Sequence, residues 1–368
     1  MTRETGELFF DKVAPPYVPS LEETQPPPAI RSDDPFDAPF TMSELEIVLK
    51  HVKDSAPGID GLPYSFIVNT GKIARNYFLD ILNTCFNNGW VPDQWKTQII
   101  IPILKPGKHV DDPNGFRPVA LSSVLVKILE HLIKNRFEWI VESRGLLPSS
   151  QFGFRKGLST MDSVGILLTD IRISFSKNHS VVASFLDISS AYDNVLLPIL
   201  RQKLHQLRLP VKLVECICFI LMSRSLVLRV QGEEFEKRTT WRGLPQGSVL
   251  SPILYNLYTA DIGSCLNSNC HLLQYADDLA LNVSDDSIQD ASSSLSLSLD
   301  SLNEWLSDHG LSLSAPKSSV IVFSRKRTLP QVQVQIQGHN VPIVQNVKFL
   351  GVCLDSKLSG KSSSKLFI

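Results

Sequence analysis

Apolar residues recur every three or four positions in several stretches of the chain, and this spacing predicts amphipathic helices. The first predicted helix begins at Thr41, which together with Glu44 fits a capping box. Three further helices are predicted over residues 122–141, 251–262 and 288–308. Ser and Leu alternate in the last of these, as in a strand, but its length of about 20 residues and a stop at Gly310 favour a helix.

Short apolar runs bounded by turn residues predict strands between these helices. They cover residues 99–104, 181–187, 272–273, 279–281, 311–313 and 320–323. Pro102 interrupts the first run, which predicts an edge strand or a bulge there. Alternating apolar residues over 332–343 predict a hairpin that turns at 338–340. Helices and strands thus alternate without an internal repeat.

Carboxylates lie at the ends of two of these predicted strands. Asp277 and Asp278 lie between the two arms of a predicted hairpin, and Asp187 ends the run that starts at Val181. Magnesium prefers oxygen ligands and completes its coordination with water and substrate phosphates, so acids brought together here predict a metal site. Adjacent Asp residues also fit a turn in which they cap their own backbone.

Composition is that of a globular protein, with 43% hydrophobic and 20% charged residues among 368. The net charge of −1 conceals an acidic start and a basic stretch over 96–156, which has ten Lys or Arg and five Asp or Glu. The six cysteines have no paired C-x-x-C spacing, which indicates neither a zinc site nor a disulfide framework and fits a reducing compartment. No apolar stretch is long enough to span a bilayer, so we expect a soluble, intracellular protein, cytoplasmic or nuclear.

Three motifs, in this order, resemble successive signatures of reverse transcriptases. They are Phe185–Asp193, Gly243–Pro252 and Tyr275–Asp278. Further matches lie at residues 56–61, 116–119, 151–157 and 349–352, so the similarity covers roughly residues 40 to 355. The chain is similar to the polymerases of non-LTR (LINE-like) retrotransposons, particularly the jockey-like elements of arthropods.

This resemblance implies an α+β right-hand polymerase fold, with fingers, a palm built on an antiparallel sheet with helices, and a truncated thumb. The implied organisation is a flexible leader or linker over 1–40, a reverse transcriptase domain over 41–355 that ends near the primer-grip hairpin, and a truncated tail over 356–368. The implied reaction is nucleotidyl transfer from deoxynucleotides to a primer 3′-hydroxyl on an RNA template. Two Mg²⁺ ions, which Mn²⁺ can replace, are the implied cofactors.

The resemblance also assigns roles to individual residues. Asp187, Asp277 and Asp278 are the implied catalytic residues and metal ligands, and the backbone carbonyl of Ile188 is a further ligand. The implied substrate-binding residues are Lys105, Arg117, Tyr192, Gln246, Gly247 and Lys317. The implied nucleic-acid-binding residues are Arg155, Lys156, Phe349, Leu350 and Gly351.

Simpler interpretations of several of these residues remain open. Tyr192, implied to exclude a ribose 2′-hydroxyl, also fits a core aromatic, and the accompanying Asp193 also fits a structural role. The stretch from Gly243 to Ser248 also fits a plain tight turn, and the basic residues also fit a solvated surface.

The implied partners are an RNA template, a DNA primer, deoxynucleotides, the element's RNA and another element-encoded protein, with no membrane. One rival function is a decayed or repurposed fragment that binds nucleic acid without extending a primer. Another is an RNA-dependent RNA polymerase that shares the palm, which an aromatic residue at Tyr192 disfavours.

Overall fold

The computed structural model describes residues 1–15, 32–314, 317–336 and 338–360. The predicted leader and the predicted tail over 356–368 therefore fall partly outside the described residues. In the described ranges no helix is both long enough and apolar enough to cross a bilayer. The chain divides into two compact units, each assembled from two separate segments. The first unit comprises Met1–Leu146 and Tyr192–Tyr255, and the second comprises Leu147–Ala191 and Asn256–Ile368.

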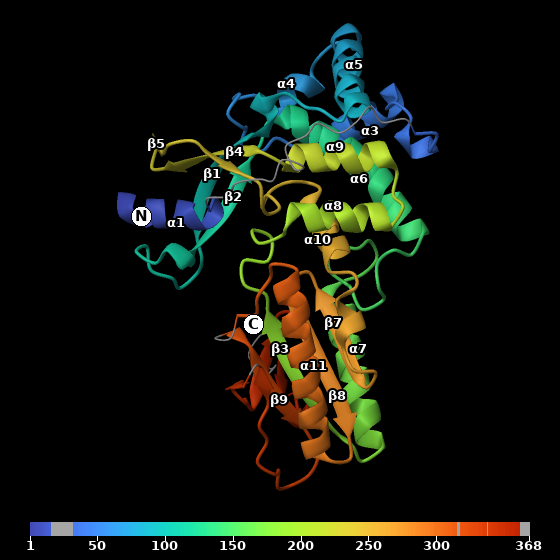
Figure 1. Ribbon diagram of the computed structural model, residues 1–368, viewed down its shortest axis with the longest axis vertical. Coiled ribbons are helices and arrows are strands. Elements are labelled where there is room, and N and C mark those ends of the chain that lie inside the picture. The colour runs from blue at the N-terminus through green and yellow to red at the C-terminus, as the bar shows by residue number, and fades with distance from the viewer. Residues whose placement is uncertain (16–31, 315–316, 337, 361–368) are drawn as a thin grey trace. The chain divides into compact units, whose positions relative to one another are not determined.

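The first unit contains a five-stranded mixed sheet in the order β2-β1-β4-β5, with β6 also paired to β4 (Figure 1). Its strands are β1 (Thr97–Leu104), β2 (Phe116–Leu121), β4 (Arg224–Val230), β5 (Glu233–Glu234) and β6 (Arg238–Thr240). β1 pairs with β4 only from Thr97 to Ile100, whereas its pairing with β2 continues to Leu104. Pro102 therefore lies where β1 has become an edge of the described sheet, as the sequence predicted.

The helices of the first unit pack largely on one another, and the first of them packs against β4. They are α1 (Arg3–Val13), α3 (Met42–His51), α4 (Tyr64–Val68), α5 (Lys72–Asn88), α6 (Val124–Ser143), α8 (Leu197–Gln206) and α9 (Val211–Leu221), with short 3-10 turns at Pro35–Asp37, Asp93–Lys96 and Pro113–Gly115. The predicted capping box is confirmed, because the Thr41 hydroxyl accepts from the N–H of Glu44 and the Thr41 N–H donates to the Glu44 carboxylate. α6 confirms the helix predicted over 122–141.

A helix, α1, occupies part of the segment predicted as a flexible leader, so that prediction is wrong for Arg3–Val13. Phe9 and Phe10 are buried and pack in a cluster with Phe116 and Phe235 of the sheet region. Val13 follows Phe9 and Phe10 at helical spacing, and the Thr2 side chain accepts from the N–H of Thr5 at the start of the helix. The sequence prediction missed these signals, and burial against the sheet adds to them.

The second unit contains a four-stranded, fully antiparallel sheet in the order β7-β8-β3-β9. Its elements are α7 (Thr160–Ser176), β3 (Ser180–Asp187), a 3-10 turn (Ile262–Cys265), β7 (Cys270–Tyr275), β8 (Asp278–Asp285), α11 (Ile288–Asp308), β9 (Ser319–Phe323), β10 (Gln335–Ile336), β11 (His339–Asn340), β12 (Asn346–Phe349) and β13 (Val352–Asp355). α10 (Ser251–Tyr258) contains the boundary between the two units.

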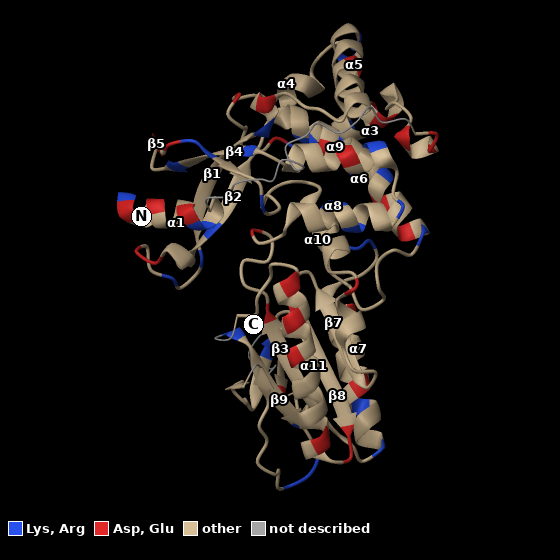
Figure 2. Cartoon of the chain, in the orientation of Figure 1, with Lys and Arg blue, Asp and Glu red and all other residues tan. Residues whose placement is uncertain are grey.

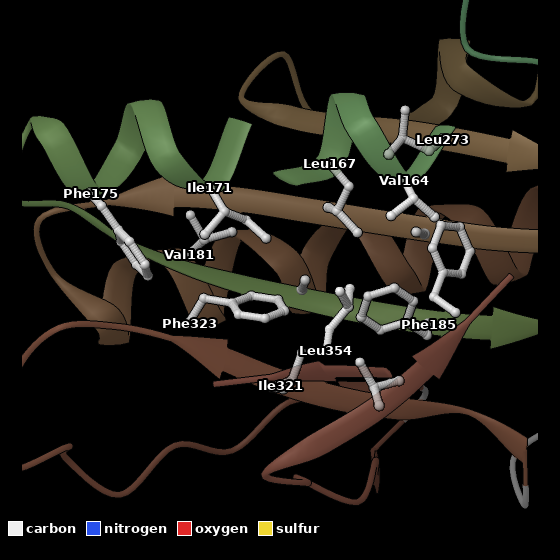
Figure 3. Close-up of a cluster of buried hydrophobic side chains, with 14 of the residues drawn as sticks. Val164, Leu167, Ile171, Phe175, Val181, Phe185, Leu273, Ile321, Phe323 and Leu354 are labelled. Atoms are coloured by element: carbon white, nitrogen blue, oxygen red, sulfur yellow. The ribbon is translucent and has the colours of Figure 1, made fainter. Parts of the chain in front are cut away.

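Both faces of β3 are buried, since its first seven residues are all inaccessible to solvent. α7 covers the face that carries Val181 and Phe185, and Figure 3 shows Leu167 and Ile171 of this helix directed toward the strands. α11 packs against β3 and β8. The sheet is therefore a buried layer whose strand ends remain available for a site.

Several boundaries differ from those predicted. α10 ends at Tyr258 instead of continuing to residue 262. His339 and Asn340 form β11 rather than a turn, and residue 337 lies outside the described residues. Leu313 makes a single bridge to Ile188 rather than a strand. The hairpin formed by β7 and β8 and the long helix α11 are both confirmed.

Candidate active site

Two of the predicted catalytic acids face each other across neighbouring strands of the second unit. β3 ends at Asp187, β8 begins at Asp278, and the antiparallel register pairs these two residues directly. Directly opposite residues in such a ladder have Cβ atoms roughly 4.5–5.5 Å apart. Tyr275 pairs with Asp278, so Ala276 and Asp277 form the two-residue turn between β7 and β8. The sheet thus gathers three Asp residues from two distant segments at one end.

Repulsion within this group affects its protonation. Burial, together with the charges of Asp277 and Asp187, raises the pKa of Asp278 to about 6, while Lys317 acts in the opposite direction. The ammonium of Lys317 donates to Oδ2 of Asp187 at 2.6 Å. The three Asp side chains therefore attract positive charge, and in this structure the Lys317 ammonium supplies one such charge.

Residues 151–153 pack against the turn that carries Asp277 and hold it in place. Gln151 is fully buried, and its Oε1 accepts from the backbone N–H groups of Gly153 and Ala276 at 2.9 and 3.2 Å. Ala276 has a left-handed φ of 58°. A Cβ at Gly153 would lie 2.4 Å from the nitrogen of Ala276, so only glycine fits there. The structure thus assigns Gln151 and Gly153 to positioning the turn.

A groove of about 360 Å³, open to solvent, lies beside the acids. Asp187, Asp278 and Lys317 line one part of it, and the hairpin formed by β12 and β13 lines another. Phe349 points into the core, where its ring lies 5.0 Å from that of Phe185. The tip of the hairpin, Leu350-Gly351, has φ values of 47° and 87°. The side chain of Phe349 is buried and supports the hairpin, whereas Gly351 at the tip is exposed.

The first unit holds the predicted Gly-rich loop, Gly243–Leu250, between two other backbone segments. A Cβ at Gly243 would lie 2.7 Å from the carbonyl oxygen of Asp193, and one at Gly247 would lie 2.7 Å from that of Ala120. Both glycines also have positive φ, of 77° and 127°. Ala120 donates its N–H to the carbonyl of Gln246 at 2.8 Å. This is a packed loop with required glycines rather than a generic surface turn.

Gln246 and Asp193 bind each other within this loop region. The Gln246 amide nitrogen lies 3.1 and 3.3 Å from the two carboxylate oxygens of Asp193. Burial raises the pKa of Asp193, while the bond from Gln246 opposes that effect. Asp193 therefore has the structural role that the sequence left open, and it fixes the orientation of the Gln246 side chain.

Tyr192 lies beside the same loop. Its carbonyl accepts from the N–H of Leu244 at 2.7 Å. Its ring stacks on that of Tyr255, with centroids 4.8 Å apart and an interplanar angle of 15°. Tyr192 is half-buried, with its hydroxyl buried, whereas Tyr255 is fully buried.

Two buried charges that the sequence analysis missed hold the Gly243–Leu250 loop. Glu130 of α6 accepts from the N–H of Val249 at 2.9 Å, and burial raises the pKa of this carboxyl. Arg224 donates to the carbonyls of Arg242 and Gly243, each at 2.6 Å, and burial lowers its pKa to about 10. A signal existed in the sequence, because Lys127 and Glu130 are charged residues one turn apart within a largely apolar helix.

The remaining predicted basic residues lie in different settings. Lys105 follows β1 and donates to the carbonyl of Asn114 at 3.0 Å, and Arg117 is exposed on β2. Arg155 donates to the carbonyls of Pro148 and Gln151, while Lys156 is exposed. Arg155 therefore stabilises its own loop, and Arg117 and Lys156 present charge to solvent.

The predicted site residues fall into two groups. The structure brings together Asp187, Ile188, Asp277, Asp278, Lys317 and the β12–β13 tip in the second unit, which also contains Arg155 and Lys156. Lys105, Arg117, Tyr192, Gln246 and Gly247 belong to the first unit.

Within the described ranges, no group of three or more His, Cys, Asp or Glu side chains is arranged to hold a metal ion by itself. Magnesium is commonly held by one or two carboxylates plus substrate phosphates, without a cage made of protein ligands alone. The paired acids, their mutual repulsion and the ammonium bound to Asp187 fit that mode of binding.

Known proteins resemble this chain over most of its length. The family described as "Reverse transcriptase (RNA-dependent DNA polymerase)" matches residues 103–354. The "Probable RNA-directed DNA polymerase from transposon BS" of Drosophila melanogaster is 31% identical, over 89% of this chain and 38% of that protein. The "RNA-directed DNA polymerase from mobile element jockey" of Drosophila funebris is 32% identical, over 87% of this chain and 36% of that protein.

Among solved structures, the apo telomerase of Candida tropicalis, truncated from its C-terminal domain, has a TM-score of 0.49 and 14% identity, over 72% of this chain and 54% of that chain. The chain spans about two fifths of the length of the two curated relatives. The matched residues include the paired acids, the Gly243–Leu250 loop and the β12–β13 hairpin. The chain therefore belongs to the reverse transcriptase family, and the polymerases of jockey-type non-LTR retrotransposons are among its relatives.

Proposed function

We propose that this chain is an RNA-directed DNA polymerase that adds deoxynucleotides to a DNA primer on an RNA template. The observation that carries the proposal is the direct cross-strand pairing of Asp187 and Asp278, with Asp277 adjacent, in a member of this family. In the reaction, the primer 3′ oxygen loses its proton and bonds to the α-phosphorus. The bond from that phosphorus to the bridging oxygen breaks, and pyrophosphate leaves.

Asp187, Asp277, Asp278 and the carbonyl of Ile188 would hold two Mg²⁺ ions, or Mn²⁺ in their place, which stabilise charge on the attacking and leaving oxygens. The three carboxylates keep this end of the sheet negative and so disfavour any occupant without compensating positive charge. Lys317 neutralises Asp187 in this structure and would move to the phosphates of the incoming nucleotide.

The other predicted residues take supporting roles in this proposal. Lys105, Arg117, Gln246 and Gly247 contact the nucleotide, and Tyr192 excludes the ribose 2′-hydroxyl. Leu350 and Gly351 contact the primer through their backbone, with Phe349 as their anchor in the core. Arg155 and Lys156 lie near the template backbone, where basic residues position a strand without reading its sequence.

The partners we propose are the RNA of the element, a DNA primer and another protein encoded by the same element. Such a polymerase meets its RNA and its chromosomal target inside the cell, in the cytoplasm or the nucleus.

The test is extension of a labelled DNA primer by one nucleotide on an RNA template, with Mg²⁺ and at low salt. Asp277→Asn is compared with Asp308→Asn, which changes an exposed acid of α11 in the same way. We expect the parent and Asp308→Asn to extend the primer, and Asp277→Asn to bind the duplex without extending it. An active Asp277→Asn protein would remove Asp277 from the mechanism, and binding without extension by the parent would favour a fragment that only binds nucleic acid.

A further inference from the structure

Discrimination against ribonucleotides presents a mechanical problem. A ribonucleotide differs from its deoxy counterpart by one added hydroxyl, and a pocket that merely fits the smaller molecule rejects such an addition only by about a hundredfold. The wall must therefore not yield to the hydroxyl. A residue that excludes the 2′-hydroxyl needs a fixed ring, held by packing from another rigid element.

The backbone of Tyr192 is fixed, but that does not fix its ring. Tyr192 lies in a turn in which Ser190 has a left-handed φ of 47°, and its carbonyl is bonded to Leu244 at 2.7 Å. The orientation of the ring depends on the packing around the side chain, whose hydroxyl is buried. The ring therefore needs a second support.

Tyr255 supplies a flat, immobile surface for that ring. It is 0% exposed, and its neighbours in α10, Leu254 and Leu257, are also fully or almost fully buried. Its ring is nearly parallel to that of Tyr192, at 15°, with the centroids 4.8 Å apart. This is an offset stack in which one face of Tyr192 is covered.

We propose that Tyr255 is a specificity-determining positioning residue, which holds the Tyr192 ring in place and thereby sets the preference for deoxyribonucleotides over ribonucleotides. This inference rests on the proposed polymerase function and extends it to a buried side chain that does not touch the sugar itself. Loss of the stack lets the Tyr192 ring rotate away from an incoming 2′-hydroxyl.

The experiment measures kcat/KM for a ribonucleotide and for the matching deoxyribonucleotide, and the ratio of the two is the readout. Tyr255→Leu removes the stacked ring, Tyr255→Phe keeps it without the hydroxyl, and Tyr192→Ala removes the wall itself. Tyr258→Leu is the matched control, since Tyr258 is also 0% exposed, in the same helix, and its hydroxyl bonds to the carbonyl of His309. Melting temperatures show whether Tyr255→Leu and Tyr258→Leu lose comparable stability.

We expect the ribonucleotide to deoxyribonucleotide ratio to rise about tenfold or more in Tyr255→Leu and in Tyr192→Ala. Tyr255→Phe and Tyr258→Leu should keep the parental ratio. If Tyr255→Leu does not fold, Tyr255→Met takes its place, because a flexible thioether fills the volume without offering a ring face.

Each other outcome overturns a distinct statement. A parental ratio in Tyr255→Leu, with an altered ratio in Tyr192→Ala, would refute the role of Tyr255 and leave the polymerase function intact. A changed ratio in Tyr258→Leu would show that general loss of packing, rather than the stack, governs selectivity. A parent that extends no primer would overturn the proposed function and this inference together.

Discussion

Gly153 shows how the position of Asp277, a proposed catalytic acid, depends on a residue with no chemistry of its own. The turn that carries Asp277 packs directly on this glycine, so a methyl group at Gly153 would meet the backbone nitrogen of Ala276 at 2.4 Å. Backbone cannot rotate away as a flexible side chain can. Gln151, which bonds both Gly153 and Ala276, would be displaced together with the turn.

We therefore predict that Gly153→Ala destabilises the protein by about 1–3 kcal/mol and lowers kcat for nucleotide addition. Gly165→Ala is the control, because Gly165 lies in α7 and an added Cβ meets nothing within 4 Å. That substitution should stabilise the helix by about 0.5–1 kcal/mol. Denaturant unfolding and single-nucleotide extension measure both effects, and equal behaviour of the two variants would contradict the prediction.

A second prediction concerns the proton on Asp278. Its pKa is raised from 3.8 to about 6, so the stability contributed by the protonated form is present at low pH and is lost as pH rises through about 6. The charged carboxylate consequently destabilises the folded protein at neutral pH. The full shift corresponds to about 3 kcal/mol, which solvent screening of this exposed carboxyl reduces to about 1 kcal/mol.

Asp278→Asn should therefore raise the free energy of unfolding at pH 8 by about 1 kcal/mol, with a smaller gain at pH 5. Denaturant titrations of the two proteins at both pH values measure the difference. A gain that is the same at pH 5 and pH 8 would mean that the carboxylate repulsion is not its cause.

At the scale of elements, α6 connects the core of the first unit to the Gly243–Leu250 loop through one buried carboxylate. Glu130 is 1% exposed and accepts the N–H of Val249. Leucine at this position would leave that N–H without its acceptor, and a buried unpaired group of this kind costs about 1–3 kcal/mol. Glutamine keeps an oxygen in nearly the same place.

We predict that Glu130→Leu lowers the free energy of unfolding by about 1–3 kcal/mol and raises KM for deoxynucleotides, because the loop that carries Gln246 loosens. Glu130→Gln should show a much smaller effect on both quantities. Thermal unfolding and steady-state kinetics test the pair, and an unchanged KM in a folded Glu130→Leu protein would argue that the loop does not depend on this contact.

Elements with a strong local signal could be predicted from the sequence. The capping box at Thr41, the stripe of α11 and the hairpin carrying Asp277 depend on neighbouring residues, and each is confirmed. α1 was missed although Thr2 caps it, and its burial of Phe9 and Phe10 against a distant sheet is a contact that local spacing does not reveal. The same reason explains part of the missed support of the site, since Glu130 and Gln151 bond to segments 119 and 125 residues away, whereas Arg224 bonds to Gly243, 19 residues away.

Charged residues are distributed unevenly over the surface of the molecule, which the net charge does not show. α11 carries Asp300, Glu304 and Asp308 at intervals of four residues, and Figure 2 shows acidic residues along this helix. A helix face of this kind repels a phosphate backbone. The net charge of −1 is therefore compatible with nucleic-acid binding elsewhere on the surface.

Each of the two units is built from two segments that are separated in the sequence by a segment of the other unit. The core of the second unit combines residues from Phe152 to Phe185 with residues from Leu273 to Leu354. A protein that joins residues 147–191 to residues 256–360 through a short flexible linker should unfold cooperatively. The contiguous fragment of residues 192–360 lacks β3, and we expect it to unfold without cooperativity.

Denaturant unfolding followed by circular dichroism distinguishes the two fragments. Cooperative unfolding of the contiguous fragment, with none in the joined protein, would show that the second unit does not have an independent core.

The position of β3 in the chain also has a consequence for synthesis on the ribosome. β3 ends at Asp187, while β8, its central partner, begins only at Asp278. Translation adds roughly 5–20 residues each second, so this apolar strand emerges several seconds before the strand that pairs with it. During that interval its edges are open to other nascent chains. Production of this protein should therefore depend on the supply of chaperones that bind extended apolar segments. It should depend less on how slowly the chain is translated.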